Sequence, residues 1–381
     1  MRVLFSAPPS TGHLLPALPT LQALRAAGHD VLVAAYGADA GRYLGLGLSV
    51  TDISDGTTLA EMYEKHAPGR RTGNPGLTAR QIFAAPARAN AALSRNSVAP
   101  LLKLVHDWSP ELLIHDPFQG AIPLVSAITK VPVIEHQSGM VSGRVLTEMI
   151  AHHLQDLYRE NGVPGPPPSV SIEVAPPSLI HHDENSLHVK YVSQHGSALV
   201  PPHLLARGTR ARIVITFGTV MHAATQAQRL AGLMSVLAKC DADFLLPMAV
   251  DIDDAAITSI PDNVTTLPFV PISELLRNCD AIVHHGGSGT LLSAVASGVP
   301  QLIIPHAGDQ FFNSELAHRI GFGLSLPAID QIDSDVIKRL LNDDHLHAVA
   351  AEVQAENAAQ PSPAELISRL LATMEIFSAA E

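Results

Sequence analysis

Short apolar runs alternate with longer amphipathic stretches along most of this chain, and this alternation restricts the fold more than any other feature. The pattern is typical of βαβ units that build a parallel sheet. In the first half, the runs expected to form strands are residues 3–7, 30–35, 48–53, 112–115 and 131–135. A helix is expected over residues 15–27, and the polar segment 54–90 is expected to be an excursion of loop and helix.

A second series of strands begins after a change in composition. Residues 163–170 and 175–178 are rich in proline, and residues 194–208 have the character of an interdomain linker. The strand pattern then restarts at residues 211–217, 243–246, 264–267, 281–284 and 301–304. A chain of 381 residues is long enough for two domains. We therefore predict an α/β protein with two doubly wound, Rossmann-like domains that face each other across a cleft.

Composition argues against several classes of protein. The net charge is −12 and no basic face is visible, so neither nucleic acid nor an anionic membrane surface is an expected partner. Two cysteines, Cys240 and Cys279, are too few for a disulfide framework or a four-cysteine zinc site. We expect two buried free thiols, with a single bridge as the alternative. No signal peptide or membrane-spanning segment is found, so a soluble, cytoplasmic protein is expected.

The most informative segment is the glycine-rich stretch 284–290, His-His-Gly-Gly-Ser-Gly-Thr, which follows an expected strand and opens an expected helix. Backbone N–H groups and the helix dipole at such a turn attract phosphate, and the missing Cβ atoms let it approach. The candidate diphosphate-binding residues are His284, Gly286, Gly287, Ser288, Gly289 and Thr290. The alternative is a glycine turn that only packs the helix on the strand.

The stretch 284–290 differs from the common phosphate-binding motifs. It has no P-loop lysine, and no Gly-x-Gly-x-x-Gly follows the first strand, so neutral donors and the helix dipole are expected to hold the phosphates. Thr219, after the first strand of the second series, is a second candidate contact, with a plain turn as the alternative. The first and fourth strands of a doubly wound sheet are neighbours, so the loops that carry Thr219 and His284 should meet.

The same geometry recurs in the first half. His13 follows the first strand and Asp116 follows the fourth, so the two side chains should lie side by side. A carboxylate on one ring nitrogen makes histidine a general base for a hydroxyl, and the alternative is a loop or capping histidine. Asp309 and Gln310, after the strand at 301–304, offer acceptors and donors suited to sugar hydroxyls. The alternative for Asp309 is a helix cap.

Taken together, these segments resemble a known family. The motifs are Thr-Gly-His-x-x-Pro at residues 11–16, Pro-Pro-Ser-Leu at 176–179, the stretch 284–290, Gly-Val-Pro-Gln at 298–301 and Asp-Gln at 309–310. Their order resembles that of the GT-B nucleotide-sugar glycosyltransferases of actinomycete antibiotic pathways, which decorate macrolides, enediynes such as calicheamicin, aromatic polyketides and glycopeptides. The resemblance covers nearly the whole chain.

The resemblance implies a role for each motif. His13 would deprotonate the acceptor hydroxyl, with Asp116 orienting it. The stretch from His284, together with Gly12 and Thr219, would hold the donor diphosphate, and Asp309 and Gln310 would read the sugar. Phe269 stands where the family usually has an aromatic residue, often Trp, before a proline. Phe269 would therefore pack on the nucleobase, and Val270 would bond it through its backbone.

The resemblance also implies a domain organisation. Residues 1–200 would form the acceptor-binding domain and residues 201–362 the nucleotide-sugar-binding domain. Residues 363–381 would form a C-terminal helix that crosses back to brace the first domain.

The function predicted on these grounds is metal-independent, inverting sugar transfer to a hydroxyl of a hydrophobic natural-product aglycone. The expected donor is a dTDP-linked deoxysugar, with a UDP-sugar as the alternative, and no cofactor is expected. A different class stays open, a catalytically silent glycosyltransferase-like auxiliary or binding protein. Whether the chain forms a homodimer is left open by the sequence.

Overall fold

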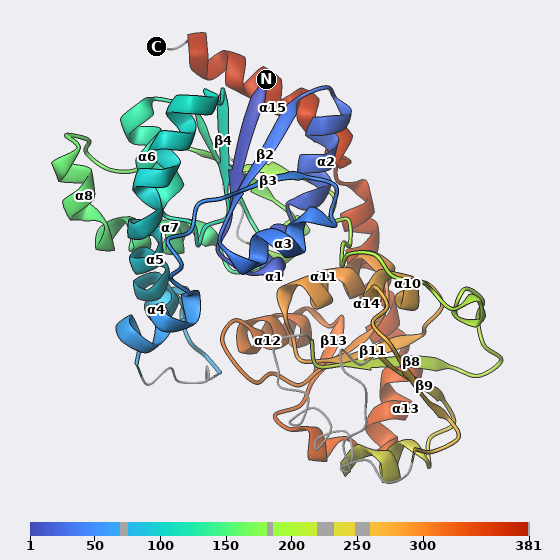
Figure 1. Cartoon of the computed structure of the whole chain (residues 1–381). Helices are drawn as coiled ribbons and strands as arrows, with labels where there is room; N and C mark the ends of the chain where they lie inside the picture. The colour runs from blue at the N-terminus through green and yellow to red at the C-terminus, as the bar shows by residue number, and fades with distance from the viewer. Residues whose placement is uncertain (69–74, 181–185, 219–231, 248–259, 380–381) are drawn as a thin grey trace. The chain divides into compact units, whose positions relative to one another are not determined.

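The computed structural model describes residues 1–68, 75–180, 186–218, 232–247 and 260–379 (Figure 1). The chain divides into two compact units. The first comprises Met1–Arg71, Leu77–Lys190 and Gln360–Glu381, and the second Thr72–Gly76 and Tyr191–Ala359. The first of these units thus ends at Lys190, ten residues before the predicted boundary at residue 200. The chain returns to the first unit at Gln360.

The first unit is built on a sheet of parallel strands in the order β3-β2-β1-β4-β5-β6-β7 (Figure 1). The strands are β1 (Arg2–Ser6), β2 (Asp30–Ala35), β3 (Ser49–Asp52), β4 (Leu112–His115), β5 (Val133–His136), β6 (Val170–Glu173) and β7 (Ser186–His188). The order reverses between β1 and β4, which pair directly, with Ser6 opposite His115. In an open α/β sheet, ligands bind at the carboxyl ends of the strands beside such a reversal.

Helices cover both faces of this sheet (Figure 1). They are α1 (Thr11–Leu14), α2 (Leu18–Ala26), α3 (Ala38–Leu44), α4 (Leu59–His66), α5 (Ala79–Trp108), α6 (Ala121–Thr129), α7 (Gly143–His153), α8 (Gln155–Glu160) and α15 (Pro363–Ala379), with a 3-10 turn at Pro177–Leu179. Helix α5 packs against α4, α6 and α7, and α15 packs against α2 and β7. The predicted excursion at 54–90 thus contains α4 and the first turns of α5.

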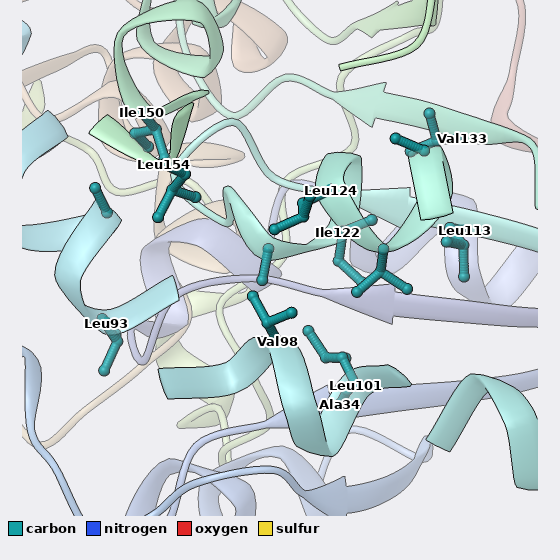
Figure 2. Packing of buried hydrophobic residues seen from close by; sticks show 14 of the residues in the cluster. Ala34, Leu93, Val98, Leu101, Leu113, Ile122, Leu124, Val133, Ile150 and Leu154 are labelled. Atoms are coloured by element: carbon teal, nitrogen blue, oxygen red, sulfur yellow. The ribbon is translucent and has the colours of Figure 1, made fainter. Parts of the chain in front are cut away.

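The core of the first unit lies between α5, α6, α7 and the sheet (Figure 2). It is built from aliphatic side chains such as Leu101, Leu113, Ile122 and Leu124, none of which is exposed. Burial of each such side chain contributes about 1.5–3 kcal/mol. With aromatic residues at only 4%, branched aliphatic packing has to supply most of this core.

The second unit repeats the doubly wound topology with parallel strands in the order β10-β9-β8-β11-β12-β13. The strands are β8 (Arg212–Thr216), β9 (Asp243–Pro247), β10 (Val264–Leu267), β11 (Ala281–His284), β12 (Gln301–Ile303) and β13 (Gly323–Ser325). The helices are α10 (Ile272–Leu276), α11 (Ser288–Ser297), α12 (Gln310–Ile320), α13 (Ser334–Asn342) and α14 (Asp344–Ala359), with 3-10 turns at Pro202–Leu204 and Ile329–Gln331. The predicted pairing of the first and fourth strands is confirmed by β8 and β11.

Alternate residues of the central strands enter different cores. Ile213 and Ile215 of β8 join a cluster with α13, whereas Val214 between them joins a cluster with α10 and α11. Side chains of a strand point to opposite faces in turn, so a sheet covered on both faces needs a continuous apolar run. This requirement explains why the sequence shows unbroken apolar runs rather than apolar–polar alternation at these strands.

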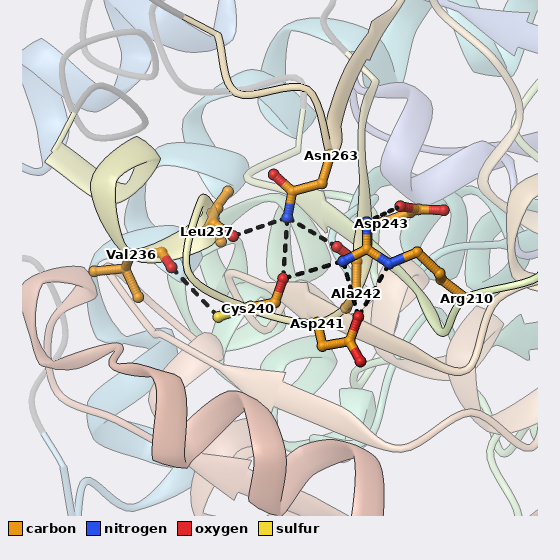
Figure 3. A network of polar contacts seen from close by, with 8 residues as sticks. All are labelled: Arg210, Val236, Leu237, Cys240, Asp241, Ala242, Asp243 and Asn263. Carbon is orange, nitrogen blue, oxygen red and sulfur yellow. Dashed lines mark hydrogen bonds and ion pairs between the residues drawn. The ribbon is translucent and has the colours of Figure 1, made fainter.

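Three strands of the second unit are tied together at their amino ends by a polar network (Figure 3). Arg210, before β8, forms ion pairs of 3.1 Å with Asp241 and with Asp243 at the start of β9. Asn263, before β10, donates from Nδ2 to the carbonyls of Leu237, Cys240 and Ala242 at 2.9, 3.2 and 2.9 Å. This network therefore stabilises the amino-terminal edge of the sheet. The carboxyl ends of the strands, where ligands bind in such sheets, lie at the opposite edge.

Candidate functional site

A histidine–aspartate pair lies at the carboxyl ends of β1 and β4. His13 stands in the short helix α1 after β1, and Asp116 directly follows β4. Because these strands are neighbours, the two loops meet, and His13 Nδ1 lies 3.0 Å from Asp116 Oδ2. The Asp116 side chain is 1% exposed and that of His13 is 24% exposed. The predicted juxtaposition is confirmed, and it sets a buried carboxylate behind a partly accessible imidazole.

The pair is held in place by its own loop. Asp116 Oδ1 accepts a hydrogen bond from the backbone N–H of Phe118 at 2.9 Å, so both carboxylate oxygens are fixed. The Phe118 ring lies 4.4 Å from the His13 ring, and Ser138 Oγ lies 3.5 Å from His13 Nδ1. A carboxylate at Nδ1 favours the tautomer with its proton there, which directs the basic lone pair to Nε2.

Two other histidines at the same strand ends support loops. His115 Nδ1 lies 3.0 Å from the carbonyl oxygen of Asp116, and His136 Nδ1 lies 3.0 Å from that of Gln137. Burial lowers the pKa of both imidazoles, that of His136 to about 4. Both rings therefore stay neutral near pH 7 and donate from Nδ1 to the backbone of the loop that follows.

In the second unit, the glycine-rich stretch forms the predicted link between a strand and a helix. Strand β11 ends at His284, and α11 begins at Ser288 with Gly287 as its N-cap residue. Gly286 has φ +87, and a Cβ there would come within 2.9 Å of Ile303 and 3.1 Å of the Gln310 carbonyl oxygen. Ser288, Gly289 and Thr290 form the first turn of α11, whose N–H groups and dipole suit an anion.

The two histidines of this stretch have different surroundings. His284 is fully buried, with Nε2 2.8 Å from Gln301 Oε1, and its Nδ1 accepts a hydrogen bond from Gly286 N–H at 3.0 Å. Both ring nitrogens thus have partners inside the protein, whereas the sequence predicts that His284 donates to phosphate. In the structure this side chain supports the loop by accepting the hydrogen bond from Gly286. Burial lowers its pKa to about 3, so the ring stays neutral.

His285 is not among the residues predicted from the sequence to bind phosphate. A Cβ added at Gly218 would come within 2.7 Å of its ring and one added at Gly287 within 2.5 Å, so the ring lies between the loop after β8 and the start of α11. Its Nδ1 is buried and has no hydrogen-bond partner among the described residues. Burial lowers the pKa of His285 to about 4, so it is a neutral imidazole at the glycine-rich turn.

Asp309 and Gln310 lie at the start of α12, beside the glycine-rich loop. Asp309 occupies the N-cap position, but its side chain makes no capping hydrogen bond. Instead, its Oδ2 accepts from Ser288 Oγ at 2.9 Å and lies 3.2 Å from Nδ2 of Asn313. Gln310 Oε1 accepts from the backbone N–H groups of His306 and Ala307. The structure therefore joins two motifs that are about 20 residues apart in the sequence.

The remaining candidates are distributed over both units. Phe269, after β10, is 43% exposed, whereas Val270 beside it is buried. Such an exposed aromatic ring is suited to stacking on a base. Gly12 is exposed in the first turn of α1. Thr219 lies outside the described residues.

Neither metal-binding nor membrane-spanning features are found in the described segments. No group of three or more His, Cys, Asp or Glu side chains in them could hold a metal ion. No helix there is long and apolar enough to cross a bilayer. Cys240 and Cys279 are free and buried, which confirms the prediction of two unpaired thiols.

Comparison with known proteins gives consistent results over the whole chain. The N-terminal domain model of the erythromycin biosynthesis protein CIII-like family matches residues 22–218, and its C-terminal domain model matches residues 231–373. The elloramycin glycosyltransferase ElmGT of Streptomyces olivaceus is 33% identical over 97% of each chain. The crystal structure of the glycosyltransferase SnogD from Streptomyces nogalater has a TM-score of 0.84 and 33% identity over 98% of this chain and 99% of its own.

Two further solved structures hold ligands. Glycosyltransferase SsfS6 of Streptomyces sp. SF2575, complexed with thymidine diphosphate, has a TM-score of 0.82 and 28% identity over 98% of this chain and 99% of its own. The spinosyn rhamnosyltransferase SpnG, complexed with spinosyn aglycone, has a TM-score of 0.82 and 27% identity over 97% of this chain and 100% of its own.

Two doubly wound Rossmann-like units, with these motifs at their strand ends, define a nucleotide-sugar-dependent glycosyltransferase of the GT-B fold. The chain belongs to the erythromycin biosynthesis protein CIII-like family of antibiotic glycosyltransferases. The resemblance noted in the sequence is thereby confirmed at the level of family and fold.

Proposed function

We propose that this enzyme transfers a deoxysugar from a dTDP-sugar to a hydroxyl of a hydrophobic natural-product aglycone, with inversion at the anomeric carbon. The observation that carries the proposal is the 3.0 Å contact between His13 Nδ1 and the buried Asp116 carboxylate. The complexes of SsfS6 with thymidine diphosphate and of SpnG with an aglycone support the choice of donor and acceptor classes.

In the proposed reaction, His13 is the general base. Asp116 keeps the proton of the imidazole on Nδ1, so Nε2 accepts the proton of the acceptor hydroxyl. The acceptor oxygen forms a bond to the anomeric carbon while the bond from that carbon to the diphosphate oxygen breaks. The bonding electrons leave with the diphosphate, and a single displacement of this kind inverts the configuration. For transfer, the donor held by the second unit has to reach the hydroxyl activated by the first.

The leaving diphosphate is proposed to bind at the N-terminus of α11. The dipole and N–H groups of its first turn, with Ser288 and Thr290, would stabilise the developing charge. Because its Nδ1 is buried without a partner in the described part of the unit, His285 joins them as a neutral imidazole. His284 would act indirectly, through Gly286. Gly12 and Thr219 remain proposed contacts to the diphosphate.

The other parts of the donor have their own proposed contacts. Phe269 would stack on the base, with the backbone of Val270 as its hydrogen-bonding partner, and Asp309 with Gln310 would bind the sugar hydroxyls. No metal is required in this scheme, because protein dipoles and neutral donors stabilise the leaving group. Transfer that is unchanged in excess chelator would support this last point, and transfer restored only by added Mg²⁺ would contradict it.

Replacement of His13 by Ala tests the proposal. We expect His13→Ala to bind dTDP as the wild type does, in calorimetry, and to lose transfer by about 100-fold to 10,000-fold, the usual contribution of a general base. His152→Ala, an exposed histidine of α7, is the matched control and should keep full transfer.

The outcomes separate the parts of the proposal. A His13→Ala variant with wild-type turnover would remove the base assignment. A wild-type protein that prefers UDP to dTDP would move the donor to a UDP-sugar. If the wild type bound neither nucleotide, the protein would be a silent relative rather than an enzyme.

A further inference from the structure

One buried asparagine links the glycine-rich loop to Asp309. Asn313 lies in the first turn of α12 and is 0% exposed. Its Nδ2 lies 2.8 Å from the carbonyl oxygen of Gly286, 3.1 Å from Ser288 Oγ and 3.2 Å from Asp309 Oδ2. Three groups from the two candidate donor-binding segments therefore converge on a single amide nitrogen.

The orientation of this amide follows from chemistry. A carbonyl oxygen and a carboxylate oxygen can only accept hydrogen bonds, so the atom that faces both must be the –NH2 group. One hydrogen is donated to Gly286, and the other is shared between Ser288 and Asp309. Ser288 in turn donates to the same Asp309 oxygen at 2.9 Å. The Asp309 carboxylate is thus fixed by donors from both segments.

Each of these bonds sets a feature that a donor would meet. The bond to the Gly286 carbonyl fixes the peptide between Gly286 and Gly287, where the chain turns into α11 with Gly286 at φ +87. That turn decides where the first N–H groups of α11 point. The bond to Asp309 Oδ2 decides how its carboxylate is presented beside the loop.

The amide oxygen of Asn313 indicates that this residue does more than fill space in the core. Its Oδ1 is buried and accepts no hydrogen bond from any residue that the structure describes. An unsatisfied buried oxygen is costly, and an apolar side chain of similar size would avoid that cost. Among the described residues, therefore, Asn313 is bonded through its N–H donors alone.

We propose that Asn313 is a positioning residue that couples the diphosphate loop to the sugar-binding carboxylate, so that both parts of the donor are recognised together. This inference rests on the proposed function, since it assumes that the loop at 284–290 holds diphosphate and that Asp309 binds sugar. Asn313 itself touches neither the diphosphate nor the sugar in this scheme.

Asn313→Asp tests the coupling by pH. The new carboxylate would lie about 3 Å from Asp309 Oδ2, and two carboxylates so close share a proton instead of both ionising. At about pH 8 we expect the affinity for dTDP-glucose to fall by about 10-fold to 100-fold, the equivalent of one charge-assisted hydrogen bond. At about pH 5.5 a shared proton restores a donor between the two carboxylates, and most of that loss should be recovered.

Other titratable groups near the loop are accounted for by the same experiment. His284 and His285 have pKa values lowered by burial to about 3 and about 4, so neither changes charge over this pH interval. Measurement of the wild type at both pH values corrects for the remaining groups, His306 included.

Asn313→Ala removes the donor without adding charge. We expect it to weaken dTDP and dTDP-glucose binding by about 10-fold at both pH values. In an Asp309→Ala background, the part of this loss that depends on the sugar should disappear, because the carboxylate that Asn313 positions is gone.

Asn263 supplies a matched control. It also donates from Nδ2 to three acceptors (Figure 3). It precedes the amino end of β10, whereas the glycine-rich loop follows the carboxyl end of β11. Asn263→Asp should lower thermal stability and leave nucleotide affinity at the wild-type value at both pH values.

The possible results are distinct. Wild-type affinity of Asn313→Asp at about pH 8, or a loss in it that does not change with pH, would overturn the positioning role. Losses of dTDP-glucose affinity that are additive for Asn313→Ala and Asp309→Ala would also overturn the positioning role. A wild-type protein that binds no nucleotide would instead overturn the proposed function.

Discussion

At the scale of single residues, two buried tyrosines differ in whether the hydroxyl finds an acceptor. The Tyr191 hydroxyl donates to the Gly289 carbonyl at 3.2 Å, next to the first turn of α11. The Tyr158 hydroxyl, in the core of the first unit, is buried without a partner among the described residues. Burial raises the pKa of both phenols, so each stays protonated. A buried hydroxyl without a hydrogen-bond partner loses its hydration and lowers the stability of the folded state.

The two residues should therefore respond oppositely to loss of the hydroxyl. We expect Tyr158→Phe to raise the free energy of unfolding by up to about 1 kcal/mol, and Tyr191→Phe to lower it by about 1 kcal/mol. Denaturant titration of both variants measures this. Destabilisation by Tyr158→Phe similar to that by Tyr191→Phe would mean that the Tyr158 hydroxyl has a partner after all.

At the scale of elements, α11 has a glycine with positive φ on each side. Gly286 precedes the helix with φ +87, and Gly298 caps its end with φ +67. A Cβ at Gly286 would meet Ile303 and the Gln310 backbone, whereas one at Gly298 would meet the flexible end of the Gln354 side chain. The strain in φ therefore bears on the glycine-rich loop 284–290 at only one end of the helix.

Alanine at the two positions should separate stability from binding. We expect Gly286→Ala and Gly298→Ala each to lower the free energy of unfolding by about 1–2 kcal/mol. Only Gly286→Ala should also weaken dTDP binding, by about 10-fold or more, because it displaces the loop before the first turn. Equal affinities for dTDP in the two variants, determined by calorimetry, would argue against a diphosphate site at this loop.

At the scale of the whole molecule, buried neutral histidines make stability depend on pH. Burial lowers the pKa of His136, His195 and His285 to about 4 and that of His284 to about 3. In the unfolded chain these side chains titrate near pH 6.5. Above that pH they are neutral in both states. As the pH falls from about 6.5 to about 4, the unfolded chain binds protons that the folded chain does not, so stability is lost.

His136→Asn should reduce this acid sensitivity. A single histidine that titrates only when unfolded gives a slope of up to about 1.4 kcal/mol per pH unit in the unfolding free energy. We expect the variant to show a slope between about pH 6 and pH 4.5 that is smaller by up to this amount. His318→Asn, on the exposed side of α12, is the control. Equal slopes in His136→Asn and the wild type would show that His136 is protonated in the folded state.

The sequence by itself determined the α/β class and most of the central strands. Residues 112–115 and 281–284 are strands with the predicted bounds, because strands buried on both faces need continuous apolar runs. It also led to the meeting of His13 and Asp116, since the order of strands in a doubly wound sheet makes β1 and β4 neighbours. Motif order carried the resemblance to the family, which the family models and a relative confirm.

Only the tertiary structure decided which side chains of the motifs face inward. It directs His284 to Gln301 and leaves the buried Nδ1 of His285 without a partner among the described residues, a distinction that adjacent identical residues cannot reveal. It brings Asn313 to Gly286 and Asp309, and adds β6, β7 and β13, whose short runs carry little apolar periodicity. That a C-terminal helix returns to the first unit is implied by the resemblance, but its partner there, α2, is given by the structure. Hydrogen-bond partners and long-range packing depend on three-dimensional proximity, and local pattern does not encode that.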